Sequence, residues 1–275
     1  CVAEQEEQLR EGAKLLERVV TRVYTPGSLY EESLIGTDEV AGLAAICVKA
    51  EGVGIAILDA STGHVWTMEH TGDERWDRLL DDLLRSSPRE VIFSPRDAEK
   101  EEVRKVISQL DGVTLSQHNS SKRKGESALK NVLEVADLGH IDLGDSPLAM
   151  DAAGLAADYL ATMHVVDSID VKEVEIMQPD GNMVLDQTTL RNLELTQTLA
   201  GEKEGSLLGA IDRCRTSMGR RMLKQWILRP LANKDKIEAR QDAVASLARS
   251  SRRLDDIRNS LRGLRDLERL ATQLS

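Results

Sequence analysis

Residues 43–68 read LAAICVKAEGVGIAILDASTGHVWTM, and this stretch decides the fold of the first half of the chain. It contains three short apolar runs, at 43–48, 53–59 and 64–68, and the last run alternates apolar with polar residues. Turn-forming Gly, Lys, Ser and Thr residues lie between the runs, and connections this short join neighbouring antiparallel strands. The stretch therefore predicts an antiparallel meander of three strands.

Helices and strands alternate after the meander. Leucines at helical spacing predict a helix over 73–85, and a short apolar run predicts a strand at 90–93. A second helix is expected at 97–110 and a last strand at 113–115. Strands that alternate with helices need crossover connections and pair in parallel. A meander of three strands followed by this alternation is the ribonuclease-H-like order, so we expect an α/β domain over residues 20–135.

The second half of the chain has helical periodicity, and the first eighteen residues are expected to form one polar helix. We expect Asp186, Ser217 and Asn233 to cap helices, because their side chains accept hydrogen bonds from the free N–H groups of a first turn. A hairpin of two short strands is expected at 174–177 and 183–185. The predicted fold class is thus α/β followed by all-α. The expected helices are 148–163, 186–199, one that starts at or near Ser206, 218–228, 234–247, 254–261 and 264–274.

Charge is distributed unevenly along the chain. The formal net charge of -11 argues against a surface that wraps nucleic acid over its whole length. Residues 212–275, however, hold 16 of the 36 Lys and Arg residues and only 8 of the 47 Asp and Glu residues, a local balance of +8. This asymmetry indicates different partners for the two ends, or else two solvated faces of opposite sign.

Cysteine usage and hydropathy limit the class of protein. Cys1, Cys47 and Cys214 fit neither a zinc motif nor a CxxC pair, which predicts reduced thiols in the cytoplasm. No run of about 18 apolar residues is present, so we expect no membrane span. The chain starts with an acidic, polar stretch rather than a signal peptide. Because its first residue is not Met, we expect it to be a piece of a longer protein.

A family resemblance becomes specific at residues 183–195, which read MVLDQTTLRNLEL. The stretch resembles the core-domain signature of the MutS family of DNA mismatch-repair proteins, in which an Asp-capped helix carries Arg-Asn-Leu-Glu-Leu. Upstream, VYTPGSL at 23–29 looks like the linker into the connector domain of that family, and CVAEQE at 1–6 looks like the end of its mismatch-recognition domain. Further similar segments are GSLL at 205–208, MGRRML at 218–223, WILRPL at 226–231 and RQDAV at 240–244.

The resemblance implies three parts. They are the tail of the mismatch-recognition domain at 1–19, a ribonuclease-H-like connector domain at 20–135, and an incomplete helical core or lever domain at 136–275. Such a portion would relay conformational state between mismatch recognition and the ATPase, and would offer a docking surface for MutL. The parent protein would bind DNA and form a homodimer. A recombination-linked MutS homologue stays open as an alternative, although the resemblance of Cys1 to Glu6 to the end of a mismatch-recognition domain favours the repair branch.

The chain lacks two chemical signatures of the full family. It contains no G-x-x-x-x-G-K-[ST] phosphate loop, so ATP and Mg²⁺ are expected only in an ATPase domain of the parent protein beyond Ser275. The only Phe is Phe93, which Ser94 and Pro95 follow, so the Phe-x-Glu wedge of the mismatch-reading site is absent. We therefore expect this portion to bind no cofactor and to catalyse no reaction.

A metal-dependent nuclease built on the α/β domain is the alternative from another functional class. Asp59 lies at the end of a predicted strand, and Asp38, Asp97 and Asp137 are its conceivable partners. Two-metal catalysis needs carboxylates that converge on ions about 4 Å apart, and no strand pattern forces these four to converge. We expect Asp59 to cap a turn instead.

Candidate binding residues are limited to basic ones near the end of the chain. No catalytic, cofactor-binding or metal-binding residue is predicted, since the five histidines show no ligand spacing such as i, i+4 on one helix. Phosphate binding depends on local positive charge, so we expect weak contacts with a DNA backbone from the arginines of the basic segment. These are Arg213, Arg215, Arg220, Arg221, Arg252 and Arg253.

Overall fold

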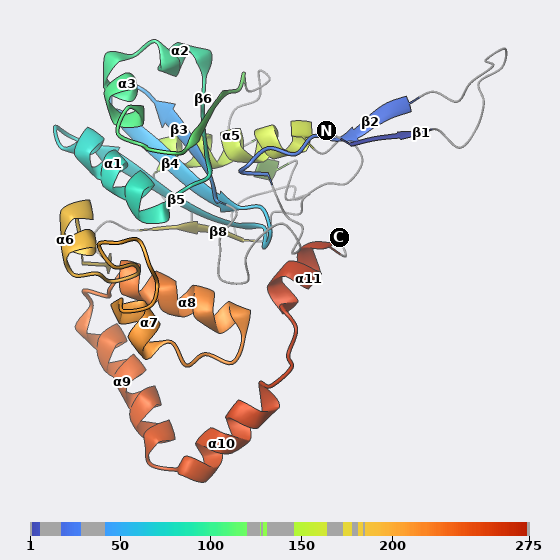
Figure 1. Cartoon of the computed structure of the whole chain (residues 1–275). Coiled ribbons are helices and arrows are strands. Elements are labelled where there is room, and N and C mark those ends of the chain that lie inside the picture. Colours follow the sequence, from blue (N-terminus) through green and yellow to red (C-terminus); the bar gives the residue numbers. More distant parts are fainter. Residues whose placement is uncertain are drawn as a thin grey trace. The chain divides into compact units, whose positions relative to one another are not determined.

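The computed structural model describes residues 2–5, 18–28, 42–119, 127, 129–130, 146–163, 173–177, 181–183 and 185–273. Its contacts divide the chain into two compact units, whose elements are labelled in Figure 1. The sheet unit comprises the described residues of Cys1–Ile35, Ala41–Ile176 and Thr272–Ser275, and the helical unit comprises those of Met177–Ala271. No helix within the described ranges is long and apolar enough to cross a membrane.

The predicted meander is confirmed in the sheet unit. β3 (Gly42–Val48), β4 (Gly52–Asp59) and β5 (His64–Thr71) pair antiparallel, with Ile46 opposite Ile55. All eight residues of β4 are buried. Successive side chains of a strand point to opposite faces, so burial along the whole of β4 means that both faces of the sheet are covered there.

Two further strands extend the sheet on the β3 side. β6 (Glu90–Phe93) pairs in parallel with β3, and β7 (Thr114–Gln117) pairs in parallel with β6. α1 (Arg75–Ser86) makes the crossover from β5 to β6 and buries Leu79 and Leu83. These elements confirm the predicted alternation of helices and strands.

The helix predicted at 97–110 is wrong in its extent. Two short helices replace it, α2 (Pro95–Ala98) and α3 (Glu101–Ile107). Lys100 separates them because its backbone is extended, with ψ of 131°. Its ammonium donates a hydrogen bond to the Val48 carbonyl oxygen at 2.8 Å, and this contact with the sheet stabilises the break.

A sixth strand lies at the other edge of the sheet. β8 (Glu173–Ile176) pairs in parallel with β5, which gives the strand order β7-β6-β3-β4-β5-β8. The hairpin predicted between 174–177 and 183–185 is therefore wrong. Asn182 instead forms an isolated bridge with Leu231. The physical reason is the edge of β5, whose backbone N–H and C=O groups need partners that β8 supplies.

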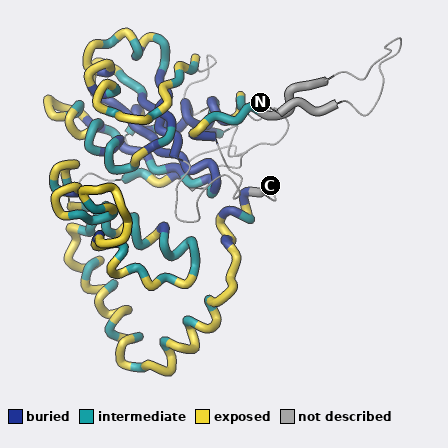
Figure 2. The backbone as a smooth tube through the Cα atoms, viewed as in Figure 1, coloured by how far each residue is buried: buried dark blue, intermediate teal, exposed yellow. Residues whose placement is uncertain are grey.

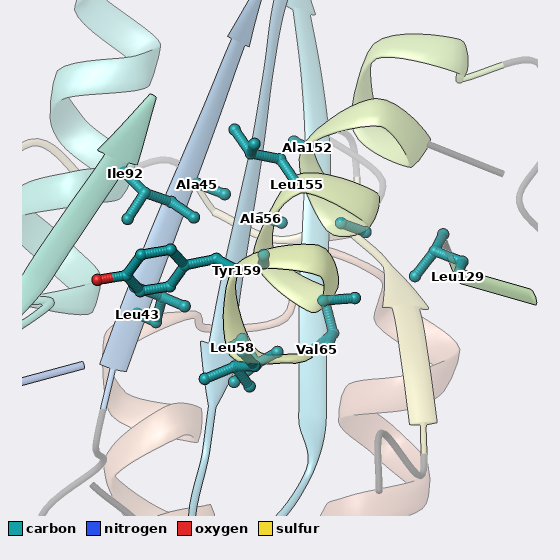
Figure 3. Close-up of a cluster of buried hydrophobic side chains, with 14 of the residues drawn as sticks. Leu43, Ala45, Ala56, Leu58, Val65, Ile92, Leu129, Ala152, Leu155 and Tyr159 are labelled. Atoms are coloured by element: carbon teal, nitrogen blue, oxygen red, sulfur yellow. The ribbon is translucent and has the colours of Figure 1, made fainter. Parts of the chain in front are cut away.

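The predicted helix at 148–163 is confirmed as α5 (Pro147–Met163), which packs on β3, β4 and β5. Figure 3 shows the cluster of buried side chains that joins this helix to the sheet. Ten residues of α5 are buried. The helix also lies so close to β4 that an added Cβ at Gly54 would clash with the Leu148 carbonyl oxygen. The helix therefore lies with the sheet, although the resemblance assigns residues from 136 onward to the helical domain.

A small two-stranded sheet is formed by β1 (Val2–Gln5) and β2 (Arg18–Arg22), which pair antiparallel. The polar helix predicted for the first eighteen residues is wrong at β1, and residues 6–17 lie outside the described residues. The β-branched Val19 and Val20 favour an extended backbone in β2, which then offers an edge for β1 to pair with.

The described part of the chain after β8 contains six helices, joined by loops. Asp186 and Asn233 cap helices as predicted, whereas Thr216 rather than Ser217 caps α8. α9 and α10 bury none of their residues, as the exposed colours of these helices in Figure 2 show. The helices are α6 (Gln187–Asn192), α7 (Leu207–Ile211), α8 (Ser217–Leu228), α9 (Lys234–Ala248), α10 (Ser251–Ser260) and α11 (Leu267–Gln273).

The helix predicted at 186–199 is too long, because α6 ends at Asn192. Glu194 has a φ of 47°, in the left-handed region that helices do not continue through. The chain then folds back, so that the N–H of Leu208 donates a hydrogen bond to the Leu195 carbonyl oxygen at 2.9 Å.

Candidate functional site

Three of the six arginines predicted to contact phosphate lie at the corner between α7 and α8. Arg213 and Arg215 are exposed on the connecting loop, and Arg220 is half-buried in the first turn of α8. Asp212 accepts a hydrogen bond from the Cys214 N–H at 3.1 Å, and its other carboxylate oxygen lies 3.8 Å from Arg220 Nε. Burial alone would raise the pKa of Asp212, but its hydrogen bonds lower it overall. The corner therefore presents two exposed arginines beside an ionised carboxylate.

A second pair, Arg252 and Arg253, lies in the first turn of α10, at the bend between α9 and α10. Both are exposed, and the Ser250 hydroxyl caps the turn by accepting a hydrogen bond from the Arg253 N–H at 3.3 Å. The surrounding residues 249–265 contain six arginines and two aspartates. In Figure 1 this bend lies away from α8, so the structure does not bring the two arginine pairs together.

Arg221 differs from the other five because it is buried. It is 7% exposed, and its guanidinium binds the Asp266 carboxylate through two hydrogen bonds of 2.5 and 2.8 Å. The Ser217 hydroxyl donates to the same carboxylate at 2.9 Å, and Glu268 accepts a further hydrogen bond from Arg221. Arg221 thus joins α8 to the residues around the start of α11.

The pKa values of this pair show that both groups are charged. Burial alone would raise the pKa of Asp266, but hydrogen bonds from Arg221 and Ser217 outweigh burial and hold it at about 2, below the ordinary 3.8. For Arg221, burial alone would lower the pKa, and hydrogen bonds to Asp266 and Glu268 raise it above the ordinary 12.5. Two carboxylates therefore neutralise Arg221, which has no free charge to offer a phosphate.

A contact that sequence reasoning missed joins α8 to α9. The Arg240 guanidinium carbon lies 3.8 Å from the centre of the Trp226 ring, which is a cation–π geometry. Trp226 is 43% exposed, so the arginine covers part of a ring that its own helix leaves in solvent. The two residues lie on different helices, and no spacing rule for a single helix connects them.

Asp59 stabilises the turn between β4 and β5, which confirms its predicted role. Its carboxylate accepts hydrogen bonds from the Ser61 N–H at 2.9 Å and from the Ser61 hydroxyl at 2.7 Å. Its carbonyl oxygen accepts a hydrogen bond from the Gly63 N–H at 2.8 Å. The carboxylate that a nuclease would need for a metal is therefore engaged inside a turn.

Of the other carboxylates of the nuclease alternative, Asp97 is the one that lies in the described part of the chain. Asp97 binds the Lys100 ammonium at 2.6 Å, and Asp38 and Asp137 lie outside the described residues. Within the described part of the chain, no group of three or more His, Cys, Asp and Glu residues could hold a metal ion. The nuclease alternative gains no support.

The described histidines have structural partners that join helices or strands to the sheet. His70 Nε2 lies 2.7 Å from an Asp82 carboxylate oxygen, which joins β5 to α1, and both residues are buried. His118 Nε2 lies 3.0 Å from Asp158, a residue of α5. His64 Nε2 lies 3.8 Å from a carboxylate oxygen of Glu175, which joins β5 to β8. His140 and His164 lie outside the described residues.

Cys47, in β3, is a free thiol. Burial raises the pKa of Cys47 to about 12, and nearby carboxylates add to the effect. A thiol with so high a pKa stays protonated and unreactive near neutral pH. Cys214 is half-buried at the corner between α7 and α8, and Cys1 lies outside the described residues.

Two sequence models of one family match the chain. The model of MutS domain II matches residues 41–165, within the sheet unit, and the model of MutS domain III matches residues 188–275, from α6 to the end.

Relatives match along nearly the whole chain. The DNA mismatch repair protein MutS of Symbiobacterium thermophilum is 36% identical over 279 residues, which cover 100% of this chain and 32% of the relative. The protein of the same name from Anaeromyxobacter dehalogenans is 35% identical over 265 residues, covering 95% of this chain and 29% of the relative. The protein of the same name from Myxococcus xanthus is 32% identical over 286 residues, which cover 100% of this chain and 31% of the relative. The chain thus spans about a third of the length of the curated relatives that it matches.

Proposed function

The chain belongs to the MutS family, and from that membership we propose that it serves as the connector and lever portion of a DNA mismatch-repair protein. Its role is to relay conformational state between a mismatch-recognition domain and an ATPase domain. The observation that carries the proposal is the order of the family matches, since domain II falls on the sheet unit and domain III falls on most of the helical unit.

The two units have properties that suit a relay. A relay needs one part that keeps its shape and one part that can rearrange. β4 and α5 bury their side chains in a continuous core, which keeps the sheet unit rigid. α9 and α10 bury none, and elements with few buried contacts open most easily.

Energy transfer between fluorescent labels placed in the two units of the parent protein tests the relay. Gln109, after α3, and Ser246, on α9, are both exposed, and Asp77 of α1 is exposed in the sheet unit. We expect ATP to change the energy transfer between labels at Gln109 and Ser246, and to leave a control pair at Gln109 and Asp77 unchanged. Constant energy transfer for the first pair in all nucleotide states would reject the relay.

We further assign the sheet unit to the ribonuclease-H-like class, as a scaffold without nuclease chemistry. The support is the strand order β5-β4-β3-β6-β7, in which a meander is followed by two parallel strands on the β3 side. Asp59 serves the β4–β5 turn in this assignment.

We also propose that MutL docks on the sheet unit in the parent protein, as the family resemblance implies. Crosslinking the parent to MutL on mismatched DNA is expected to place contacts within the domain at residues 20–135. Contacts confined to the ATPase domain would reject this docking site.

Weak, non-specific DNA binding is the third part of the proposal. The exposed pairs Arg213 with Arg215 and Arg252 with Arg253 offer free charge, whereas Arg221 is neutralised. We expect dissociation constants of about 10⁻⁴ to 10⁻⁶ M that rise steeply with salt. Homoduplex and G·T heteroduplex should bind equally. A tenfold preference for the heteroduplex, about 1.4 kcal/mol, would show that this chain reads mismatches itself.

The remaining partners belong to the parent protein. We propose that its ATPase domain binds ATP and Mg²⁺, that it acts as a homodimer in the cytoplasm, and that this portion has no catalytic role. The purified chain is then expected to neither bind nor hydrolyse ATP, because its sequence contains no phosphate loop. Hydrolysis that persists through further purification would overturn the non-catalytic role.

A further inference from the structure

Glu90, the first residue of β6, is fully buried, and three donors satisfy its carboxylate. The Tyr159 hydroxyl donates to Oε1 at 2.7 Å, and the Ser116 hydroxyl donates to the same oxygen at 2.5 Å. The Gly27 N–H donates to Oε2 at 3.0 Å. Burying a charge is costly unless hydrogen bonds replace its water, so these donors are what permits a carboxylate at this place in the core.

The third donor belongs to residues 23–28, which precede the sheet in the chain and which we name the lead-in segment. Its turn is closed by Ser28, a fully buried residue whose hydroxyl accepts a hydrogen bond from the Thr25 N–H at 2.8 Å. Gly27 approaches the sheet so closely that an added Cβ would lie 2.8 Å from Glu90 Cβ. Only glycine lets the backbone reach the carboxylate at this position.

A second attachment lies at the start of the lead-in segment. The Val23 N–H donates a hydrogen bond to the carbonyl oxygen of Met163, the last residue of α5, at 3.0 Å. Tyr159, which binds Glu90, lies one turn earlier in the same helix. Burial and the hydrogen bond to Glu90 raise the pKa of Tyr159, so its hydroxyl keeps the proton that it donates.

We propose that Glu90 is a positioning residue that fixes the lead-in segment to the sheet unit, so that residues 23–28 move with the sheet as one body. β2 ends at Arg22, directly before this segment. A change of orientation between β2 and the large sheet must then arise at the junction between Arg22 and Val23. This last consequence rests on the proposed relay, whereas the attachment itself does not.

The chemistry of the three donors explains why a carboxylate is needed. An amide side chain offers one acceptor oxygen and one donor nitrogen, whereas all three partners of Glu90 donate. The two hydroxyls can turn and accept, but the Gly27 N–H cannot. Glu90→Gln should therefore keep part of the attachment, and Glu90→Ala should remove it.

Amide hydrogen exchange on the whole chain tests the attachment. Glu90→Ala is expected to speed the exchange of the Gly27 and Ser28 amides by about tenfold or more, because a hydrogen bond to a charged acceptor is lost. Glu90→Gln should give a smaller acceleration. The amides of β4 should exchange as in the unchanged chain, which shows that the sheet stays folded.

Two further variants keep the test decisive. Thr67→Val removes a buried hydroxyl whose single proton lies between the carbonyl oxygens of Ile55, at 2.9 Å, and Ala149 of α5, at 2.7 Å, so it weakens the joint between sheet and α5 at another place. It should leave the lead-in amides unchanged. Gly27→Ala displaces the segment through the clash with Glu90 and should accelerate the same amides even if Glu90→Ala fails to fold.

The attachment is overturned if Glu90→Ala folds and the Gly27 amide exchanges at its original rate. Equal acceleration in Thr67→Val would also overturn it, because the effect would then be general loosening of the unit. The label experiment on the parent protein reads the relay independently. If the label experiment rejects the relay but Glu90→Ala accelerates exchange at Gly27, the attachment of the lead-in segment still holds.

Discussion

The sheet unit and the helical unit are stabilised in different ways. In the sheet unit, β4 is buried along its whole length and α5 buries ten residues. In the helical unit, α9 and α10 bury none, and eleven of the twelve large hydrophobic residues that are exposed in the described chain belong to this unit. The first unit therefore rests on an apolar core, and the second on helix caps and on polar contacts such as that between Arg221 and Asp266.

This difference teaches how one chain can combine a rigid body with helices that rearrange. Burial contributes about 25 cal/mol for each Å² of apolar surface, so a continuous core adds up to a large stabilisation. A helix cap contributes about 1 kcal/mol, and an exposed ion pair contributes about 0–1 kcal/mol. Helices held mainly by such contacts open locally at a lower free energy than the sheet.

The largest expected effect comes from truncating an apolar side chain in each unit. Leu58→Ala, in the core of the sheet unit, should lower the free energy of unfolding by about 2–5 kcal/mol, because a cavity replaces packed atoms. Val244→Ala, at a side chain that is 66% exposed on α9, should change it by less than about 0.5 kcal/mol. Urea unfolding followed by circular dichroism measures both, and equal losses would break the comparison.

Breaking the buried ion pair is expected to be the next largest effect. Arg221→Met removes the guanidinium that makes two hydrogen bonds to the buried Asp266 carboxylate, which should destabilise the helical unit by about 3 kcal/mol. Arg252→Met, at an exposed position, is the matched control and should have an effect below about 0.5 kcal/mol. Fluorescence of Trp226, with the other two tryptophans replaced by Phe, reports unfolding of α8. A loss for Arg221→Met no greater than for the control would show that the pair does not hold the unit.

The same ion pair should make the free energy of unfolding of the helical unit depend on pH. Asp266 has a folded pKa of about 2, below its ordinary 3.8, so its stabilisation is complete above about pH 5 and falls as pH drops toward 2. The full effect is about 2 kcal/mol, of which about 1 kcal/mol should be lost by pH 3. Urea midpoints read from Trp226 at pH 5 and pH 3 measure the loss. Asp266→Asn should abolish this part of the pH dependence, and a dependence unchanged in that variant would assign it to other groups.

The smallest expected effect concerns Asp59 in the sheet unit. Asp59→Asn keeps an acceptor oxygen for the Ser61 N–H, so the turn should lose about 1 kcal/mol or less. Repair by the parent protein should stay within a few-fold of its original level in a mutation-rate assay. Loss of repair by a variant that folds normally would instead point to a metal site at Asp59.

The fold of the sheet unit could be predicted from sequence where neighbouring segments pair. β3, β4 and β5 follow one another with short turns, so their alternation and turn residues determine the pairing. A strand was predicted where β8 lies, but its pairing could not be, because its partner β5 lies about a hundred residues earlier in the chain. Glu194 shows a second limit, since its left-handed φ depends on the contacts of the loop that follows rather than on its own propensity.

The positive charge of the candidate site could be predicted from the sequence, but the burial of its individual arginines could not. Arg220 and Arg221 are adjacent arginines, so the sequence predicts a phosphate contact for both of them. The helix turns them to different surroundings, and of these two arginines it is Arg221 that pairs with Asp266, 45 residues later. Contacts between residues this far apart leave no periodic signal in a single sequence.

Native-state hydrogen exchange across both units tests the central claim, that a rigid sheet unit carries helices of lower local stability. We expect the amides of β4 to exchange only through global unfolding. The amides of α9 should open at a free energy lower by about 2 kcal/mol or more, which is roughly thirtyfold faster exchange after correction for intrinsic rates. Equal protection of β4 and α9 would contradict the division of the chain into a rigid body and a set of helices that can rearrange.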